Sequence, residues 1–521
     1  MDFSDKAEEF LRIASQFRLG VLETEKPHPK TANLSELVLN DLSRAVSILK
    51  EIDLEALAVI PARQAEILQL KADIEKTLSN GRRIFLAGCG ATGRLSLVLE
   101  VLWRKERIGT AYEGSVVSFM AGGDTALIRS IEDFEDHPEN AHRQLTDLGF
   151  GEGDLLIAIT EGGETPFVIG AAEKAVERSA NNPYFLYCNP DELLMGLTDR
   201  TTRILTNPAV HRINLSVGPM ALTGSTRMQA STVLMYVVGL ALLCAFRDLP
   251  VENDVTNFLH YLEQADYSFL EGFIETEAGH YKAGNYMFYE TGDDLGICVL
   301  TDTTERSPTF SLHPFENIQD RDAPVSLAYL CLPDAPDTHA AWHNLLRRPP
   351  RPLGWDEYPV TSLQYLEGFD FSTNARGRRE RAVVPGQLII FDIRRTVDSI
   401  KLVLGERVGY LQTGNLSLLH QHLLLKMILN IHSTLVMGKM GRYESNLMTW
   451  VRASNNKLID RAARYVLLLL ERDGIICSYA QVIRRLFIIT GQYSQGVYGI
   501  STERPIVLET YRSLAEADKH K

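Results

Sequence analysis

The sequence has no closely spaced cysteine pair, no long apolar run and no excess of positive charge. Its six cysteines occur singly, which predicts reduced thiols and neither a disulfide framework nor a zinc site. The longest uncharged apolar run, residues 233–246, is shorter than the ~20 residues that span a bilayer, so it predicts a buried helix. The first residues lack the basic and apolar regions of a secretion signal, and we expect a cytoplasmic protein.

A formal net charge of −14 argues against nucleic acid or an anionic membrane as a partner, because both require a clustered cationic face. The basic stretch 376–381 is typical of a solvated loop. His420 and His422 are two residues apart on a helical pattern and so point to different sides, and we expect no bound metal. No G-x-S-x-G elbow follows a strand, which gives little support to a serine hydrolase.

The length of 521 residues, 45% of them hydrophobic, favours two domains over one. From Arg82 onward, apolar strands alternate with segments of helical spacing. This alternation predicts a mostly parallel sheet with helices on both faces. The predicted strands are residues 83–87, 116–121, 155–159, 184–187 and 212–215.

A fainter version of the same alternation follows, and the Pro-rich stretch 348–359 within it predicts a rigid loop. The chain after Leu416 has a helical pattern. We therefore predict an α/β fold of two doubly wound parallel-sheet domains, with a helical N-terminal segment and a helical C-terminal region. The apolar runs of the second half are residues 287–290, 295–300, 325–332 and 388–392, and the expected boundaries are 1–70, 71–250, 251–435 and 436–521.

Gly88–Gly93 fits G-x-G-x-x-G between a strand and a helix, the pattern of a phosphate-binding turn. A dinucleotide site also needs an acidic residue after the second strand. Glu113 lies before that strand, and Asp124 lies beyond two glycines. The sequence therefore favours a small phosphorylated ligand over a nicotinamide, and we expect no cofactor.

Polar loops follow the first and third predicted strands, and each lies at a helix N-terminus, which favours an anion. Thr92 and Thr165 supply their hydroxyl groups, although either residue alone is more often a helix N-cap. A third hydroxyl cluster precedes the apolar helix and exceeds what capping requires. It consists of Thr223, Ser225 and Thr226.

Several motifs together resemble one family, the sugar isomerase (SIS) domains of N-acetylmuramic acid 6-phosphate etherase and glucokinase regulatory protein. Residues 23–35, 446–448 and 454–462 are similar to the terminal segments of the same family. Etherases of the family are short chains with one SIS domain, whereas the regulatory protein has two SIS domains and a helical end, as this chain does. The motifs are GCGATGR, FMAGGD, Glu135-Asp136, EGGETPFVIG, CNPDE and GPMALTGSTRM.

The resemblance implies a sugar-phosphate site in the first domain. It places Glu135 on sugar hydroxyls, residues 160–162 on the phosphate, and Lys457 as a cation that reaches in from the C-terminal helices. Without the matched motifs, an exposed helix charge for Lys457 and a solvated carboxylate for Glu135 would be the better interpretations. The expected binding residues are Gly90, Ala91, Thr92, Gly93, Glu135, Thr160, Glu161, Gly162, Thr165, Ser225, Asn455 and Lys457.

The family's etherases use two glutamates, one to take a proton and one to donate it. Glu135 matches one of them, but the position eight residues after Arg94 is Leu102, which transfers no proton. Glu100 faces elsewhere on the helix, and Glu106 lies one turn further along. The sequence therefore favours a sugar-phosphate sensor or regulator. An etherase-like lyase or a hexose-phosphate isomerase, with Glu135 as its catalytic residue, is the alternative.

The resemblance also sets the expected partners. The ligand is a hexose or amino-sugar 6-phosphate or fructose 1-phosphate, and a sugar-kinase protein is a second possible partner. In the second half, residues 303–307 are either a helix cap or a degenerate phosphate loop, and the cap is the favoured interpretation.

Overall fold

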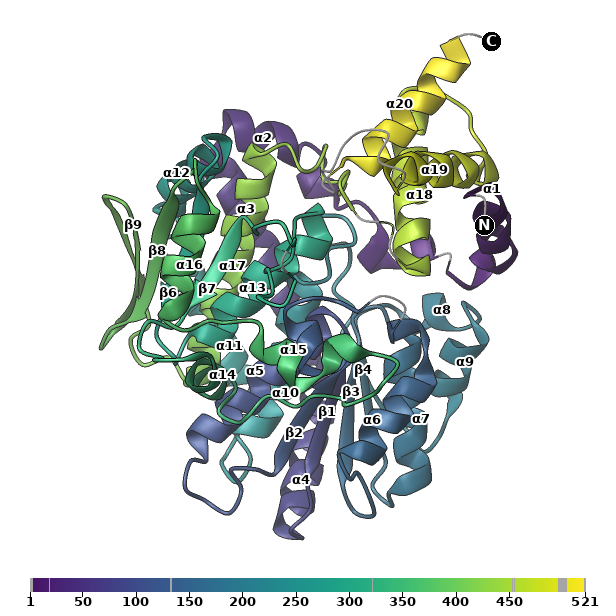
Figure 1. Ribbon diagram of the computed structural model, residues 1–521. Coiled ribbons are helices and arrows are strands. Elements are labelled where there is room, and N and C mark those ends of the chain that lie inside the picture. Colours follow the sequence, from purple (N-terminus) through teal and green to yellow (C-terminus); the bar gives the residue numbers. More distant parts are fainter. Residues whose placement is uncertain are drawn as a thin grey trace.

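Two five-stranded sheets form the centre of the computed structural model, which describes residues 3–17, 19–131, 134–320, 322–451, 453, 455–494 and 504–519 (Figure 1). The first sheet is parallel throughout and has the order β2-β1-β3-β4-β5. Each strand lies within one residue of its predicted range, so these predictions are confirmed. The strands are β1 (Ile84–Gly88), β2 (Val116–Met120), β3 (Leu155–Ile159), β4 (Tyr184–Tyr187) and β5 (His211–Asn214).

The first sheet is covered on both faces, which explains why its strands read as continuous apolar runs. Along β1, Ile84 and Leu86 join the core beneath α4, α5 and α10, while Phe85 and Ala87 join the core beneath α6, α7 and α9. The helices of this domain are α4 (Gln64–Ser79), α5 (Ala91–Glu106), α6 (Pro138–Asp147), α7 (Pro166–Arg178), α8 (Asp191–Leu194), α9 (Asp199–Thr206) and α10 (Gln229–Leu243).

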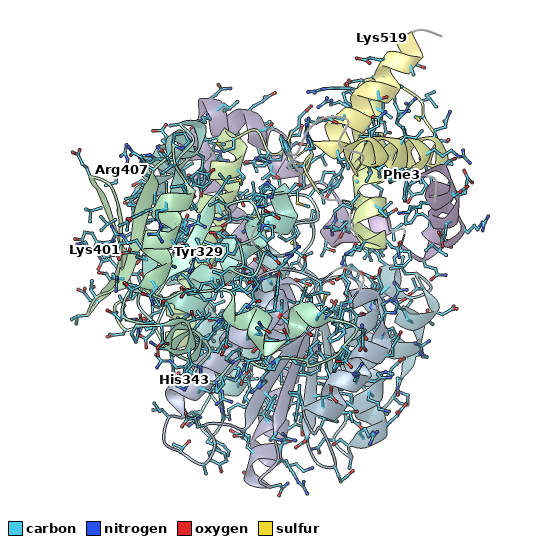
Figure 2. The ribbon with its side chains drawn as sticks, viewed as in Figure 1. Phe3, Tyr329, His343, Lys401, Arg407 and Lys519 are labelled. Atoms are coloured by element: carbon cyan, nitrogen blue, oxygen red, sulfur yellow. The ribbon has the colours of Figure 1, made fainter. Side chains whose placement is uncertain are left out.

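The second sheet has the order β10-β9-β8-β6-β7 and is mixed. Its core of β7, β6 and β8 is parallel as predicted, but β9 and β10 add an antiparallel hairpin that the sequence analysis did not foresee. Lys401 and Arg407, labelled in Figure 2, lie on this hairpin at the edge of the molecule. The strands are β6 (Tyr286–Thr291), β7 (Ala328–Cys331), β8 (Leu388–Arg395), β9 (Ser399–Leu404) and β10 (Arg407–Gln412).

Two predictions in the second half are wrong. Residues 295–300, expected as a strand, belong almost entirely to helix α13 (Gly296–Phe310), and residues 303–307 lie within the same helix as neither cap nor loop. Helix α13 packs against α5, α17 and β7 and is buried on most sides. A buried helix shows no apolar periodicity, so its run of apolar residues cannot be distinguished from a buried strand.

Two apolar helices, α10 and α17 (Leu418–Lys439), pack against each other and join the two halves of the molecule. Every residue of α10 is buried, which confirms the buried helix predicted for this stretch. The remaining helices of the second half are α11 (Val251–Gln264), α12 (Leu270–Lys282), α14 (Thr338–Leu346), α15 (Leu363–Glu367) and α16 (Asn374–Ala382).

The two ends of the chain meet beside the first domain. Helix α1 packs against α19, and Phe3 lies against Gly491 at their contact (Figures 1 and 2). Helices α2 and α3 instead pack on α17. The terminal helices are α1 (Phe3–Ile13), α2 (Leu34–Asn40), α3 (Leu42–Leu57), α18 (Asn456–Arg472), α19 (Tyr479–Ser494) and α20 (Ile506–Lys519). None of the helices in these described ranges is long and apolar enough to cross a membrane.

The Pro-rich loop after α14 reaches from the second domain onto the first. Arg348 donates to both carboxylate oxygens of Asp124, at 2.6 and 3.1 Å, and to Glu100 at 3.1 Å. Arg351 donates to both oxygens of Glu100. Burial acts to raise the pKa of Glu100, but Arg348, Arg351 and Arg104 outweigh it and hold this pKa far below its usual range. The loop is therefore an ionic clamp between the domains.

Replacing Arg348 with alanine is expected to destabilise the protein by about 3–5 kcal/mol, because Asp124 would stay buried without its guanidinium partner. Thermal and urea unfolding monitored by circular dichroism measures the change. Arg376→Ala is the matched control: Arg376 is half-exposed where it pairs with Glu290 and Glu380, and we expect a loss below ~1 kcal/mol. Equal midpoints for the two variants would contradict the role of the clamp.

Candidate functional site

The candidate site lies at the carboxyl ends of the strands of the first sheet. The glycine loop follows β1 and the polar loop 160–165 follows β3, and these two strands are neighbours in the sheet. Parallel strands place the loops at their carboxyl ends along one edge of the sheet, where open α/β sheets bind ligands. The two loops predicted from the sequence are therefore side by side.

The glycine loop has the geometry of an anion cradle. Gly90 has a φ of 53°, and a Cβ atom on Gly88 would lie 2.3 Å from the carbonyl carbon of Thr92, so both positions require glycine. The hydroxyl group of Thr92 donates to the Cys89 carbonyl and accepts from the Cys89 N–H, both at 2.9 Å. This hydroxyl closes the loop and is not free for a ligand. In the described part of the chain, the N–H groups of Gly90 and Ala91 donate to no acceptor.

The second loop is held by internal hydrogen bonds. The hydroxyl groups of Thr160 and Thr165 lie 3.2 Å apart, and the Gly163 N–H donates to Thr160. Thr165 occupies the N-cap position of α7, but its side chain makes no capping hydrogen bond. The Gly162 N–H has no acceptor among the described residues, and its carbonyl oxygen accepts from Asn189. The loop thus offers a backbone donor at a helix N-terminus.

Glu161 has an unusual environment for a carboxylate. Its side chain is buried, and among the described residues its Oε1 atom has no hydrogen-bond partner. Burial raises its pKa to about 7 against the opposing effect of Lys457. A buried carboxyl group that titrates near neutrality is typical of catalytic and ligand-binding sites.

Glu135 bridges the glycine loop and the C-terminal helices. It accepts from the Cys89 thiol at 2.9 Å through one carboxylate oxygen and from the Asn455 amide at 2.8 Å through the other. Lys457, the second residue of α18, lies 3.2 Å from Glu164. Burial acts to lower the pKa of Lys457, but Glu164, Glu135 and more distant Glu25 raise it, so this lysine stays charged. The structure therefore brings Glu135, Asn455 and Lys457 to the loop ends of the first sheet.

The N-terminal segment contributes a buried ion pair to the rim of the site. Both oxygens of Glu25 accept from Arg461, and Arg464 donates to one of them at 2.9 Å. Burial acts to raise the pKa of Glu25, but the two arginines hold it at about 2. A Cβ atom on Gly224 would contact both Glu25 and Arg461, so the loop after β5 meets this pair. The next residue, Ser225, is buried, and its hydroxyl finds no partner in the described chain.

Glu305 of the second domain acts electrostatically on the site, and it was not among the site residues predicted from the sequence. It is buried on α13, and its charge contributes to the raised pKa of Glu161. Burial likewise raises the pKa of Glu305, while Arg94 of the first domain and Arg227 act to lower it. Its neighbours in the sequence, Thr304 and Arg306, are polar, and the stretch 303–307 was expected to be a helix cap.

Three positions on α5 were compared with the second etherase glutamate, and all three lie outside the site. Leu102 is fully buried in the apolar core. Glu100 is bound by Ser118 and by the arginines of the clamp, and Glu106 pairs with Arg247 at the far end of α5. Neither glutamate hydrogen-bonds to a residue of the candidate site within the described ranges. Leu102 occupies the position of the second etherase glutamate, and neither Glu100 nor Glu106 on the same helix takes the place of that glutamate in the site.

Three further charged residues near the site lie within the motifs but were not predicted as site residues. Glu164, Glu25 and Arg461 belong to segments that the resemblance identified, but their charges had no evident partners until the chain was folded. Ser454, quoted in the C-terminal motif, lies outside the described residues. Among the residues that are described, no group of three or more His, Cys, Asp or Glu side chains is arranged to hold a metal ion.

The first half of the chain is similar to known proteins of one family. The family model for the glucokinase regulatory protein N-terminal SIS domain matches residues 66–176. An N-acetylmuramic acid 6-phosphate etherase of Trichodesmium erythraeum is 34% identical over 214 residues, which are 41% of this chain and 64% of that protein. An etherase of Rhodopirellula baltica is 34% identical over 225 residues, 43% of this chain and 68% of that protein. The match thus spans less than two thirds of the Trichodesmium etherase.

A solved structure with a similar fold is the tagatose-6-phosphate ketose/aldose isomerase of Escherichia coli. The alignment covers 82% of this chain and 99% of that one, with a TM-score of 0.40 and 12% sequence identity.

Glu161 is expected to make stability depend on pH. Its pKa is about 7 in the folded protein and 4.5 when unperturbed, so folding favours the protonated form, and stability falls as the pH rises through this interval. Between pH 5.5 and pH 8, the free energy of unfolding of Glu161→Gln is expected to rise on the order of 2 kcal/mol relative to that of the wild type. Urea unfolding at a series of pH values measures this gain. Glu152→Gln, at an exposed position before β3, is the control, and a parallel pH profile for both variants would contradict the assignment.

Proposed function

This chain belongs to the SIS-domain family of glucokinase regulatory protein and N-acetylmuramic acid 6-phosphate etherase, and we propose that it is a sugar-phosphate sensor. Its ligand would be a hexose or amino-sugar 6-phosphate or fructose 1-phosphate. The phosphate would lie between the glycine loop and the loop 160–165, and the sugar hydroxyls would face Glu135. Binding, and not turnover, would be the output.

The observation that carries this proposal is the group of hydrogen-bonding atoms without partners at the loop ends. The N–H groups of Gly90, Ala91 and Gly162 and the hydroxyl of Ser225 make no hydrogen bond to the described chain. Donors at the N-termini of α5 and α7 favour an anion, and Lys457 supplies a full positive charge next to them. A phosphate would satisfy these donors at once.

Lys457 would exchange its present partner for the ligand. Its ammonium group now faces Glu164, which has a second cation in Arg200 at 3.1 Å. A phosphate that attracts Lys457 would therefore leave Glu164 paired. Lys457 could therefore neutralise the ligand while the buried carboxylate of Glu164 keeps Arg200 as its counter-ion.

The absence of a second etherase glutamate on α5 favours sensing over catalysis. A second function, a lyase or isomerase of sugar phosphates, is favoured by one observation. Glu161 has a pKa of about 7, the range that suits a general acid or base at neutral pH, and the charge of Glu135 contributes to that pKa. In that case Glu135 and Glu161 would divide the proton transfers.

A sensor needs a receiver, and a sugar-kinase protein is the partner that the family resemblance suggests. The proposal is tested by adding the protein to hexokinases of its own organism, with and without the sugar phosphate. A ligand-dependent change in kinase rate would support it, and an unchanged rate would count against this partner.

Lys457→Ala is expected to weaken sugar-phosphate binding by about 10- to 100-fold, because a charge-assisted hydrogen bond to phosphate would be lost. Isothermal titration calorimetry with fructose 1-phosphate, fructose 6-phosphate, glucose 6-phosphate and N-acetylmuramic acid 6-phosphate measures the loss. Lys174→Ala on the surface of α7 is the control, because that lysine pairs with the exposed Glu177. Equal affinities for the two variants would refute the role of Lys457.

The sensor and the enzyme are separated by a turnover assay on the same four sugar phosphates. We expect stabilisation of the protein by at least one ligand and no product, as followed by thermal shift and by NMR spectroscopy of the sugar. Turnover that both Glu135→Gln and Glu161→Gln abolish would instead establish the lyase or isomerase. If no sugar phosphate stabilises the protein, the result contradicts both the sensor and the enzyme proposal.

A further inference from the structure

A cavity of about 600 Å³ lies between the first domain and the Pro-rich loop, apart from the sugar-phosphate site. Its floor is the edge strand β2 with the residues that follow it, one wall is the end of α6, and residues 348–353 of the loop form its roof. No residue of the proposed sugar-phosphate site lines it. Its volume is in the range that takes one small organic ligand.

Gln144, one of the residues that line the cavity, carries an unsatisfied pair of hydrogen-bonding groups. It lines the cavity and is 2% exposed, yet neither its Nε2 nor its Oε1 atom has a partner in the described chain. A buried amide without partners is costly, and natural proteins rarely retain one without a use. One donor beside one acceptor matches the edge of a nucleobase, as in the pairing of glutamine with adenine.

Arg104 supplies unused positive donors in the same cavity. Only its Nε atom is engaged, donating to Glu100 at 3.0 Å, and the terminal nitrogens make no hydrogen bond within the described residues. Arg104, Arg348 and Arg351 carry one charge more than the two carboxylates that they pair, Glu100 and Asp124. A guanidinium with free terminal nitrogens is suited to a phosphate group.

The other walls suit a flat ring. Phe119, Leu148 and Leu353 line the cavity together with three prolines of the loop, so the surface between the polar groups is apolar. A third carboxylate, Asp147, is on the α6 wall and accepts from the Trp355 indole at 2.8 Å. Aromatic and aliphatic side chains pack on a base regardless of its identity.

We propose that this cavity binds a mononucleotide, with the base edge on Gln144, the ring against the apolar wall and the phosphate on Arg104. The roof of the cavity continues toward the sugar-phosphate site. Trp355 stacks on Phe134 with the ring centroids 5.7 Å apart, and Phe134 directly precedes Glu135. The nucleotide would therefore bind at the junction of the domains, one side chain away from the sugar-binding glutamate.

The test uses calorimetry and thermal shift with AMP, GMP, CMP and UMP on the full chain and on its Lys457→Ala variant. The variant removes the cation proposed for sugar phosphates, so binding at that site is read separately. We expect at least one nucleotide to bind both proteins with equal affinity and to raise the melting temperature. On the Lys457→Ala variant, the matching nucleoside and ribose 5-phosphate are each expected to bind at least about tenfold more weakly than the nucleotide does.

Two substitutions locate the binding. Gln144→Leu removes the unpaired amide, so we expect the melting temperature of the protein to stay the same or rise. The affinity for the nucleotide is expected to fall by about tenfold or more. Arg104→Ala is expected to weaken the nucleotide by a similar factor, and Arg203→Ala, on the surface of α9, is the control for loss of an arginine. The proposal is overturned if no nucleotide of the panel binds, if binding disappears in Lys457→Ala, or if Gln144→Leu binds as well as the wild type.

Discussion

A carboxylate that is buried in protein must be paired with a cation or take up a proton, and this requirement organises the whole molecule. Glu100 is paired by arginines of the second domain, so it fixes one domain against the other. Glu25 is paired by arginines of α18, so it fixes the N-terminal segment to the C-terminal helices. Glu161 forms no ion pair with the described residues, and burial raises its pKa to about 7 although Lys457 acts to lower it. The pKa of each of these buried carboxyl groups thus depends on the cations that pair with it.

The proposed site is assembled from segments that lie far apart in the sequence. The glycine loop and the loop 160–165 are rigid extensions of the first sheet, whereas Lys457 and Asn455 come from α18 and Glu305 comes from the second domain. A ligand held by all of these groups would bind most tightly when the three parts are in contact. It would shift their arrangement only by the difference between its affinities for the two states. Such a site suits a protein whose output is a change of shape or of partner.

The first domain was largely predictable from the sequence, because its strands are short apolar runs that stop at glycine-rich or polar turns. The second domain was less so. Residues 295–300 were expected to form a strand because α13 is buried on most sides against α5 and α17, and such burial weakens the apolar periodicity that identifies a helix. Among the candidate site residues, Glu135 and Lys457 were found through a family resemblance, whereas Glu305 belongs to the stretch 303–307, which was expected to be a helix cap. Its position near Glu161 depends on the packing of two domains, which no short stretch of sequence encodes.

The ion pair between Glu25 and Arg461 has a consequence for how the protein is made. The glycine loop, Glu135 and Glu161 all leave the ribosome before the second domain exists, so the first sheet can form while synthesis continues. The rim of the proposed site cannot close until α18 has also emerged, because both partners of Glu25 lie on that helix. Until then Glu25 has no cation and remains in water. Ligand binding would therefore begin only after α18 had been translated, which would keep chains that lack this helix from responding to the ligand.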